Sequence, residues 1–274
     1  MFWIRDDATE IVERIGLRSV RDAWREGLSV DIVNDRGDRQ VVRIDLGTQG
    51  ICYLKRWRFP PGSKYLLFPG GGDLRKRARS ELQNLQLLLN LGITVPRPLA
   101  FGEEKGLWGP VASFLLLEEL SGYTCCYDRM LEHPDKPEEV VGGIATLLAT
   151  LHDRRIYYRS PGLKHFYLKP GSGEFAMLDV ARLDRGKPGL VSRLSGITGR
   201  EMPCAERDLS KVLLPLRAGF SSPRQVDSLF WEAYFTKRKE VGDKGDLLRR
   251  VEEQLVLREK ARERRRNRKK NSSL

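Results

Sequence analysis

Three ionisable residues in this 274-residue chain lie where phosphate and metal chemistry would need them. Lys55 falls in an alternating, strand-like run at 51–57, and Glu81 falls in the helical segment that follows. A strand holds a lysine stiffly, so its ammonium can contact phosphates if a carboxylate such as Glu81 anchors it. Asp179 directly follows an apolar strand-like run, where burial of a carboxylate is costly unless it is paired or bound to a metal ion. Together they match the parts that phosphoryl transfer requires.

Each of these residues also has a simpler interpretation. A strand lysine is usually just exposed, and Asp179 could instead cap a helix or form a salt bridge with Arg182. A third segment, 113–120, ends an apolar strand with Glu118, Glu119 and Leu120. Its backbone can meet an adenine edge while one of the two glutamates contacts a ribose, but an apolar strand that ends in charge is common. The combination, rather than any single residue, favours nucleotide chemistry.

The elements that must position these residues change in character along the chain. Strand-like alternation dominates the first part, which has one clear helix, and helical periodicity dominates the second. We therefore expect an α+β architecture with a lobe at 1–119, a helical lobe at 120–256 and a basic tail at 257–274. The expected helices are 7–25, 74–90 with Asp73 as its cap, 140–151, 207–218, 223–235 and one from 246 onward; the expected strands are 28–33, 40–46, 51–57, 98–102, 113–118, 166–168 and 175–178.

Composition narrows the class of protein. Hydrophobic residues make up 40% and charged residues 31%, as in an ordinary globular protein. The four cysteines show no metal-binding or disulfide-framework spacing, which favours a reduced, cytoplasmic setting in which they are small buried hydrophobes. We expect no secretory signal, because residues 1–16 carry acids where a basic region and an apolar run would lie. We expect no transmembrane segment either, because no apolar run approaches the roughly 18 residues a spanning helix needs.

More than half of the net charge of +12 lies at the end of the chain. Residues 257–274 hold nine Lys or Arg and two Glu. Such a tail can bind the phosphates of an anionic membrane surface at roughly 1 kcal/mol per basic residue. Two alternatives stay open: a solvated helix end that aids solubility, and, ranked behind both, contact with nucleic-acid phosphates.

Residues 151–168 carry a resemblance to a known family. In this segment His152, Ile156, Arg159, His165 and Phe166 fall into register, without a gap, with the catalytic loop of the lipopolysaccharide core heptose kinases of the Kdo/WaaP type. The stretches 178–182, 92–102 and 207–210 are similar to later and earlier segments of that family. The resemblance runs from about residue 42 to 235.

The resemblance implies a two-lobed, protein-kinase-like fold that uses ATP and Mg²⁺, with the inner-core heptose of lipid-linked lipopolysaccharide as acceptor. By position, Lys55 corresponds to the phosphate-binding lysine, Glu81 to its helix partner and Asp179 to the metal carboxylate. His165 takes the place of a metal-binding residue. Imidazole is a poorer Mg²⁺ ligand than oxygen, so a nucleotide contact or a structural role is the alternative for His165.

The chain departs from the family pattern at two places. The triplet that should end in a catalytic aspartate ends here in Ser160, after Arg159, and a serine can orient a hydroxyl but is a poor proton acceptor. The phosphate loop at 34–39 holds one glycine, Gly37, although the family's own loop is similarly poor in glycine, so this departure weighs less.

Three hypotheses follow. The first is an active sugar kinase at the inner face of the cytoplasmic membrane, whose catalytic residues are Arg159, Ser160 and Asp179. The second is a pseudokinase that binds nucleotide or a partner in the same pathway without efficient turnover, because Ser160 replaces the aspartate. The third, ranked last, is a kinase-like protein whose basic tail binds RNA.

Overall fold

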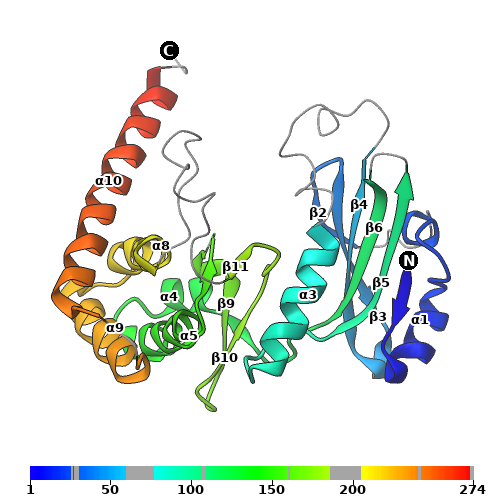
Figure 1. Cartoon of the computed structure of the whole chain (residues 1–274), viewed down its shortest axis with the longest axis horizontal. Helices are drawn as coiled ribbons and strands as arrows, with labels where there is room; N and C mark the ends of the chain where they lie inside the picture. Colours follow the sequence, from blue (N-terminus) through cyan, green and yellow to red (C-terminus); the bar gives the residue numbers. More distant parts are fainter. Residues whose placement is uncertain are drawn as a thin grey trace. The chain divides into compact units, whose positions relative to one another are not determined.

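A computed structural model describes residues 1–25, 27, 31–59, 77–106, 109–159, 161–185, 205–239 and 242–271 (Figure 1). The chain forms two compact units. Unit 1 comprises Met1–Ser121 together with Met177–Ala181, and unit 2 comprises Gly122–Ala176 and Arg182–Leu274. A short piece from late in the sequence therefore belongs to the first unit.

Unit 1 is built on a six-stranded sheet in the order β1-β5-β6-β4-β3-β2, with neighbouring strands antiparallel. The side chains of successive residues in each strand point to opposite sides, so the sheet has two distinct faces. The strands are β1 (Phe2–Ile4), β2 (Ile32–Asp35), β3 (Arg39–Asp45), β4 (Ile51–Arg58), β5 (Pro98–Gly106) and β6 (Gly109–Glu118).

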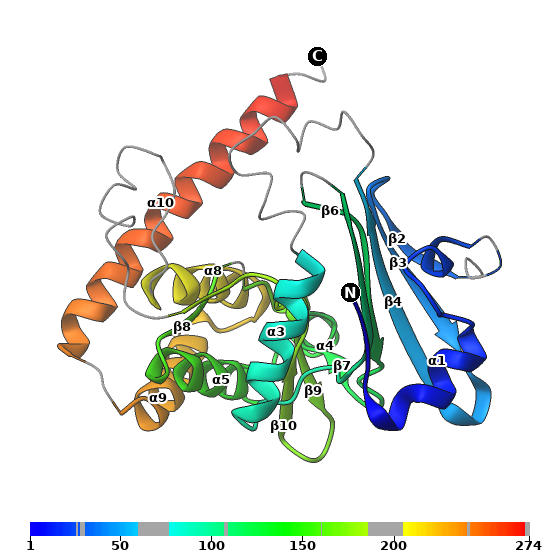
Figure 2. The ribbon, with the colours of Figure 1, turned by 45° about the vertical axis from the view of Figure 1, so that its right-hand side comes forward.

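The two faces of the sheet have different covers (Figure 2). The N-terminal segment packs on one face through Val12, Ile15 and Leu17, which form a core cluster with Leu54 and Phe114 of the sheet. This segment consists of η1 (Asp6–Ala8), α1 (Thr9–Ile15) and η2 (Asp22–Trp24). Helix α3 (Arg77–Asn90) covers the opposite face and buries its apolar stripe there.

Unit 2 is mostly helical, and its core lies between α5, α8 and α9. The apolar residues of α5 recur at helical spacing and are buried on the side facing α9 and α8, as the sequence predicts. Two small sheets, β10-β9-β7 and β11-β8, flank the helices. The elements are β7 (Thr124–Cys125), α4 (Cys126–Glu132), η6 (Pro137–Glu139), α5 (Val141–Asp153), β8 (Ile156–Tyr158), η7 (Leu163–His165), β9 (Phe166–Lys169), β10 (Glu174–Met177), β11 (Leu183–Arg185), α8 (Ala205–Gly219), α9 (Pro223–Lys237) and α10 (Lys244–Asn271).

The N-terminal helix is shorter than the sequence predicts. The expected helix over 7–25 ends at Gly16, whose φ of 75° places it in the left-handed region that terminates helices. After this helix the chain turns, and the Asp22 carboxylate accepts from the Ser19 hydroxyl at 2.9 Å. Three expectations, the cap at Asp73, the environment of Cys204 and the loop position of Ser160, lie outside the described residues.

Helix α10 is the longest helix of the described chain, with 28 residues. Its first part packs on α8 through Leu247, Val251 and Leu255, which are all buried. Its packing on α8 continues to Arg258, whose guanidinium Nε donates to Ser210 Oγ at 2.9 Å. In the part of the chain that the structure describes, no helix combines the length and apolar character required to cross a membrane.

Candidate active site

Lys55 and Glu81 form a buried ion pair in unit 1. Lys55 lies on β4 and Glu81 on α3, and the ammonium Nζ lies 2.5 Å from Glu81 Oε1. The side chains are 10% and 1% exposed. Two buried charges persist together because each compensates the desolvation of the other. The structure thus brings together the pair expected from the order of strand and helix, while its role toward a nucleotide stays a prediction.

Asp179 also belongs to unit 1, in the returning segment 177–181. Two hydrogen bonds fix this segment: Met177 N donates to Thr94 O at 3.0 Å, and Asn84 Nδ2 on α3 donates to Val180 O at 2.7 Å. Between these bonds, Asp179 has a φ of 55°, a conformation that costs a non-glycine residue of order 1 kcal/mol or more. The carboxylate of Asp179 is 40% exposed, so it is available to a ligand.

The acidic end of β6 is held by arginines. Glu118 Oε1 accepts from Arg5 at 2.6 Å, and Glu118 Oε2 accepts from Arg97 at 2.7 Å. Glu119 instead accepts a neutral hydrogen bond at its Oε1, from the Tyr53 hydroxyl at 3.1 Å. Because both oxygens of Glu118 already bind guanidinium groups, Glu119 is the better placed of the two acids to contact a ribose. The neighbouring Leu120 is half-buried.

Gly37 forms the turn between β2 and β3. Its φ of 75° requires a residue without a side chain, and its N–H donates to Asp35 Oδ1 at 2.7 Å. This hydrogen bond from Gly37 holds the pKa of Asp35 below its ordinary value, and desolvation of the Asp35 carboxyl opposes it only weakly. The turn is therefore tight and closed by its own residues.

The expected catalytic loop lies in unit 2, between β8 and β9. The two residues that precede Ser160 are held firmly: Tyr158 N donates to Asp208 Oδ2 at 2.5 Å, and Arg159 O accepts from Lys211 Nζ at 2.7 Å. The guanidinium Nε of Arg159 lies 3.7 Å from Asp184 Oδ2. His165 is half-buried at the end of η7, with its ring 6.0 Å from that of Tyr158.

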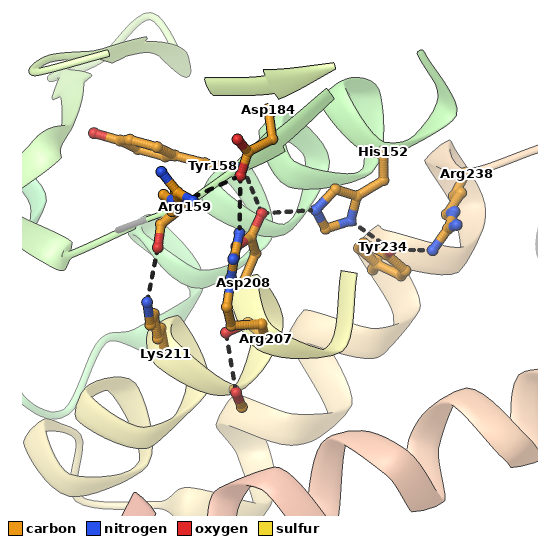
Figure 3. A network of polar contacts seen from close by, with 10 residues as sticks. His152, Tyr158, Arg159, Asp184, Arg207, Asp208, Lys211, Tyr234 and Arg238 are labelled. Carbon is orange, nitrogen blue, oxygen red and sulfur yellow. Dashed lines mark hydrogen bonds and ion pairs between the residues drawn. The ribbon is translucent and has the colours of Figure 1, made fainter. Parts of the chain in front are cut away.

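A buried polar network from helices α5, α8 and α9 holds this loop in place (Figure 3). Asp208 is fully buried on α8, and Arg207 Nη2 lies 3.3 Å from its Oδ1. His152 Nε2 lies 3.6 Å from Asp208 Oδ2, and His152 Nδ1 is 2.8 Å from the Tyr234 hydroxyl. Burial lowers the pKa of His152 below its ordinary value near 6.5, although Asp208 acts in the opposite direction.

Sequence reasoning did not find this network. Asp208 and Tyr234 lie on helices far along the chain from His152, and only the fold brings the three together. The available signal was a polar residue at the buried end of the apolar run that forms α5. Sequence reasoning also missed Arg39. This residue begins β3, and its Nη2 lies 4.0 Å from Asp179 Oδ1.

The residues of unit 1 fit a magnesium–nucleotide complex better than a dedicated metal cage. Among the described residues, no three His, Cys, Asp or Glu side chains come together as a metal-binding cluster. Mg²⁺ is often held by one or two carboxylates, substrate phosphates and water. A single partly exposed carboxylate at Asp179, in the same unit as a paired lysine, agrees with that mode.

The fold is of the protein-kinase-like class. One unit is α+β, with an antiparallel sheet and a helix whose glutamate pairs with a strand lysine, and the second unit is mostly helical. A search of solved structures supports this class: a chain described as "WaaP in complex with acyl carrier protein" matches with a TM-score of 0.66 at 16% identity, covering 93% of this chain and 98% of that one. A search of curated proteins finds no match.

Residues 73–193 match the model of the lipopolysaccharide kinase (Kdo/WaaP) family. This match confirms the resemblance seen in the sequence for the matched segment. The matched segment includes Glu81, Asp179 and the whole of the expected catalytic loop.

Proposed function

We propose that this protein is an ATP-dependent phosphotransferase that acts on a heptose of the lipopolysaccharide inner core. The observation that carries the proposal is the presence, in one compact unit, of the buried Lys55–Glu81 pair and the partly exposed carboxylate of Asp179. An anchored ammonium and a metal-binding carboxylate are the protein groups that phosphoryl transfer requires most.

The chain's own residues divide the work as follows. Lys55 binds the nucleotide phosphates while Glu81 holds its ammonium in place, and Asp179 holds Mg²⁺. The metal, when bound, supplies charge that stabilises the transferring phosphoryl group. Glu118, Glu119 and Leu120 meet the nucleoside, with Glu119 the preferred ribose contact.

The remaining residues contact the phosphates of the nucleotide and the hydroxyl of the acceptor sugar. Gly37 forms the turn that lies over the phosphates. Arg159 and Ser160 orient the acceptor hydroxyl, and positioning with charge stabilisation replaces a strong base. His165 serves as a nucleotide contact or as a second metal ligand.

Nucleotide binding is the first test. We expect full-length protein to bind ATP more tightly with Mg²⁺ than without it, as measured by titration calorimetry. In Asp179→Ala the magnesium-dependent gain should disappear, whereas Glu13→Ala, which removes an exposed acid from α1, should keep it. Equal ATP affinity with and without Mg²⁺ in the wild type would argue against a kinase.

Turnover separates the active kinase from the pseudokinase. The protein is incubated with Mg²⁺, labelled ATP and dephosphorylated core oligosaccharide, and transfer is compared with Asp179→Ala. Transfer above that control supports the enzyme. If Ser160→Asp raises turnover by orders of magnitude from a baseline equal to the control, the natural protein is a pseudokinase that binds nucleotide.

We further propose that the basic tail carries the protein to the inner face of the cytoplasmic membrane. The tail residues beyond Arg258 are exposed where their side chains are described, and cations near an anionic surface contribute about 1 kcal/mol each. A chain that ends at Glu259 keeps the Arg258–Ser210 contact and loses most of the charge.

Vesicle sedimentation tests this partner. We expect the full chain to sediment with phosphatidylserine vesicles at low salt and to be released at high salt, and the shortened chain to stay in solution. If the full chain ignores vesicles but retains RNA, the nucleic-acid alternative holds. Because the matched chain is described as WaaP in complex with acyl carrier protein, acyl carrier protein is the other partner to offer.

A further inference from the structure

The turn between β2 and β3 has few backbone donors left for a ligand. Gly37 N donates to the Asp35 side chain at 2.7 Å, Asp38 N donates to Arg36 O at 2.9 Å, and Arg36 N donates to Arg39 O at 2.9 Å. Anionic phosphates are often cradled by free N–H groups of glycine-rich turns. Here three of those groups are already used within the turn, so donors for phosphate must come from side chains.

Arg39, the first residue of β3, is placed to supply such a side-chain donor. It pairs with Trp57 across β3 and β4, and its guanidinium lies 5.7 Å from the centre of the Trp57 ring. Two residues further along, Val41 pairs with Lys55. Residues opposite each other, and residues two apart on a strand, share a face of the sheet. Arg39 therefore projects from the same face as Lys55.

The partner of Arg39 is the carboxylate expected to hold the metal. Arg39 Nη2 lies 4.0 Å from Asp179 Oδ1, which is a loose ion pair and longer than a hydrogen bond. The side chain of Arg39 is only 19% exposed, and its Nε is buried without a hydrogen-bond partner in the described part of the chain. An unsatisfied buried N–H is unfavourable by about 1–3 kcal/mol, so the guanidinium gains from an additional acceptor.

We propose that Arg39 is a second phosphate-binding cation, which pairs with Asp179 in the unliganded protein and contacts the terminal phosphates of a bound nucleoside triphosphate. This inference rests on the proposed function. With Mg²⁺ held at Asp179, the carboxylate would attract the guanidinium less strongly, and the planar fork of an arginine suits two phosphate oxygens at once. Arg39 thereby takes over the part that backbone amides play in a glycine-rich turn.

The test compares two ligands that differ in their phosphates. Full-length protein is titrated with Mg²⁺-ATP and with adenosine, followed by calorimetry. We expect Arg39→Gln to weaken Mg²⁺-ATP binding about tenfold, the value of one charge-assisted contact, and to leave adenosine binding unchanged. The matched control is Arg21→Gln, which removes the same charge from an 86% exposed side chain on the segment that covers the other face of the sheet.

The outcomes separate this inference from the proposed function. If the wild type binds neither ligand, the nucleotide function itself fails. If the wild type binds Mg²⁺-ATP and Arg39→Gln binds it equally well, the function stands and Arg39 has no role in it. An equal loss of ATP and adenosine affinity would also overturn the inference, because it shows a structural effect.

A second variant covers the case in which Arg39→Gln does not fold. Arg39→Lys keeps the positive charge near Asp179 but cannot make the paired contacts of a guanidinium. We expect a several-fold loss of Mg²⁺-ATP affinity with unchanged adenosine affinity and an unchanged thermal midpoint. Wild-type affinity for ATP in Arg39→Lys would contradict the proposed bidentate contact.

Discussion

At the scale of single residues, the Lys55–Glu81 pair combines a cost in stability with its proposed function in nucleotide binding. Buried ion pairs are rarely the most stable solution, because apolar side chains of similar size avoid the loss of hydration. Lys55 and Glu81 are both buried, and Glu81 Oε2 has no hydrogen-bond partner among the described residues. This cost in stability agrees with the proposed role of the pair in nucleotide binding, which the following variants test.

Substitutions can separate the two contributions. Glu81→Gln leaves the Lys55 ammonium buried without a countercharge, and we expect the free energy of unfolding in urea to fall by about 3 kcal/mol. The double variant Lys55→Met/Glu81→Leu removes both charges and should recover most of that loss. It should not recover ATP affinity, and a double variant that binds ATP normally would assign the pair a structural role only.

The buried His152 predicts a dependence of stability on pH. Its pKa is lowered in the folded protein, so below pH 6.5 the unfolded chain binds a proton that the folded chain does not. Stability is therefore unaffected above this pH and decreases as the pH falls below it. The slope approaches about 1.4 kcal/mol per pH unit until the folded histidine titrates.

The measurement is urea unfolding of wild type and two variants between pH 7.5 and pH 5. His152→Gln, which cannot titrate, should lose this part of the slope even though its stability is lower throughout. His133→Gln, at the end of α4, should keep the wild-type slope. Parallel curves for His152→Gln and the wild type would show that burial does not suppress protonation of His152.

At the scale of elements, local patterns predicted more than distant ones. Alternation placed β3 and β4 to within a residue, and the order of strand and helix anticipated the Lys55–Glu81 pair. The three-residue strand β1 is too short to show a period and exists only because it pairs with β5. The Arg39–Asp179 contact was missed for the same reason: it depends on the return of a distant segment to unit 1.

Adjacent glycines in α5 give a prediction at this scale. A Cβ on Gly143 would lie 2.0 Å from the ring of Phe175, whereas a Cβ on Gly142 would meet only Ala233 at 3.9 Å. Gly142→Ala should stabilise the helix by about 0.5–1 kcal/mol. Gly143→Ala should destabilise the protein by about 1–3 kcal/mol because Phe175 must move.

Thermal unfolding of both variants checks this contrast, with Gly142→Ala as the matched helix control. Gly143→Ala combined with Phe175→Ala should be no less stable than Phe175→Ala alone, since the clash is then absent. If Gly143→Ala stabilises the protein as much as Gly142→Ala does, the packing of β10 against α5 is looser than described.

At the scale of the whole molecule, unit 1 depends on five residues, 177–181, that come after the first part of unit 2 in the sequence. Asn84 holds this piece by its bond to Val180 O. Asn84→Ala should lower the free energy of unfolding by about 1–3 kcal/mol, because a buried carbonyl loses its donor. Hydrogen exchange in a peptide spanning 177–181 should become faster, while Gln83→Ala, an exposed neighbour on α3, should change neither quantity. Unchanged exchange in Asn84→Ala would show that other contacts hold the segment.

The chain crosses between the two units three times, after residues 121, 176 and 181. During synthesis, the sheet and α3 therefore leave the ribosome well before the segment that bears Asp179, and the Asn84 amide and the Thr94 carbonyl must wait for their partners. A nascent chain stopped near residue 121 would hold the lysine and glutamate but not Asp179. The unit acquires its complete set of charged groups only after about two thirds of the protein has been made, so a translation product cut short of that point lacks part of the proposed nucleotide site.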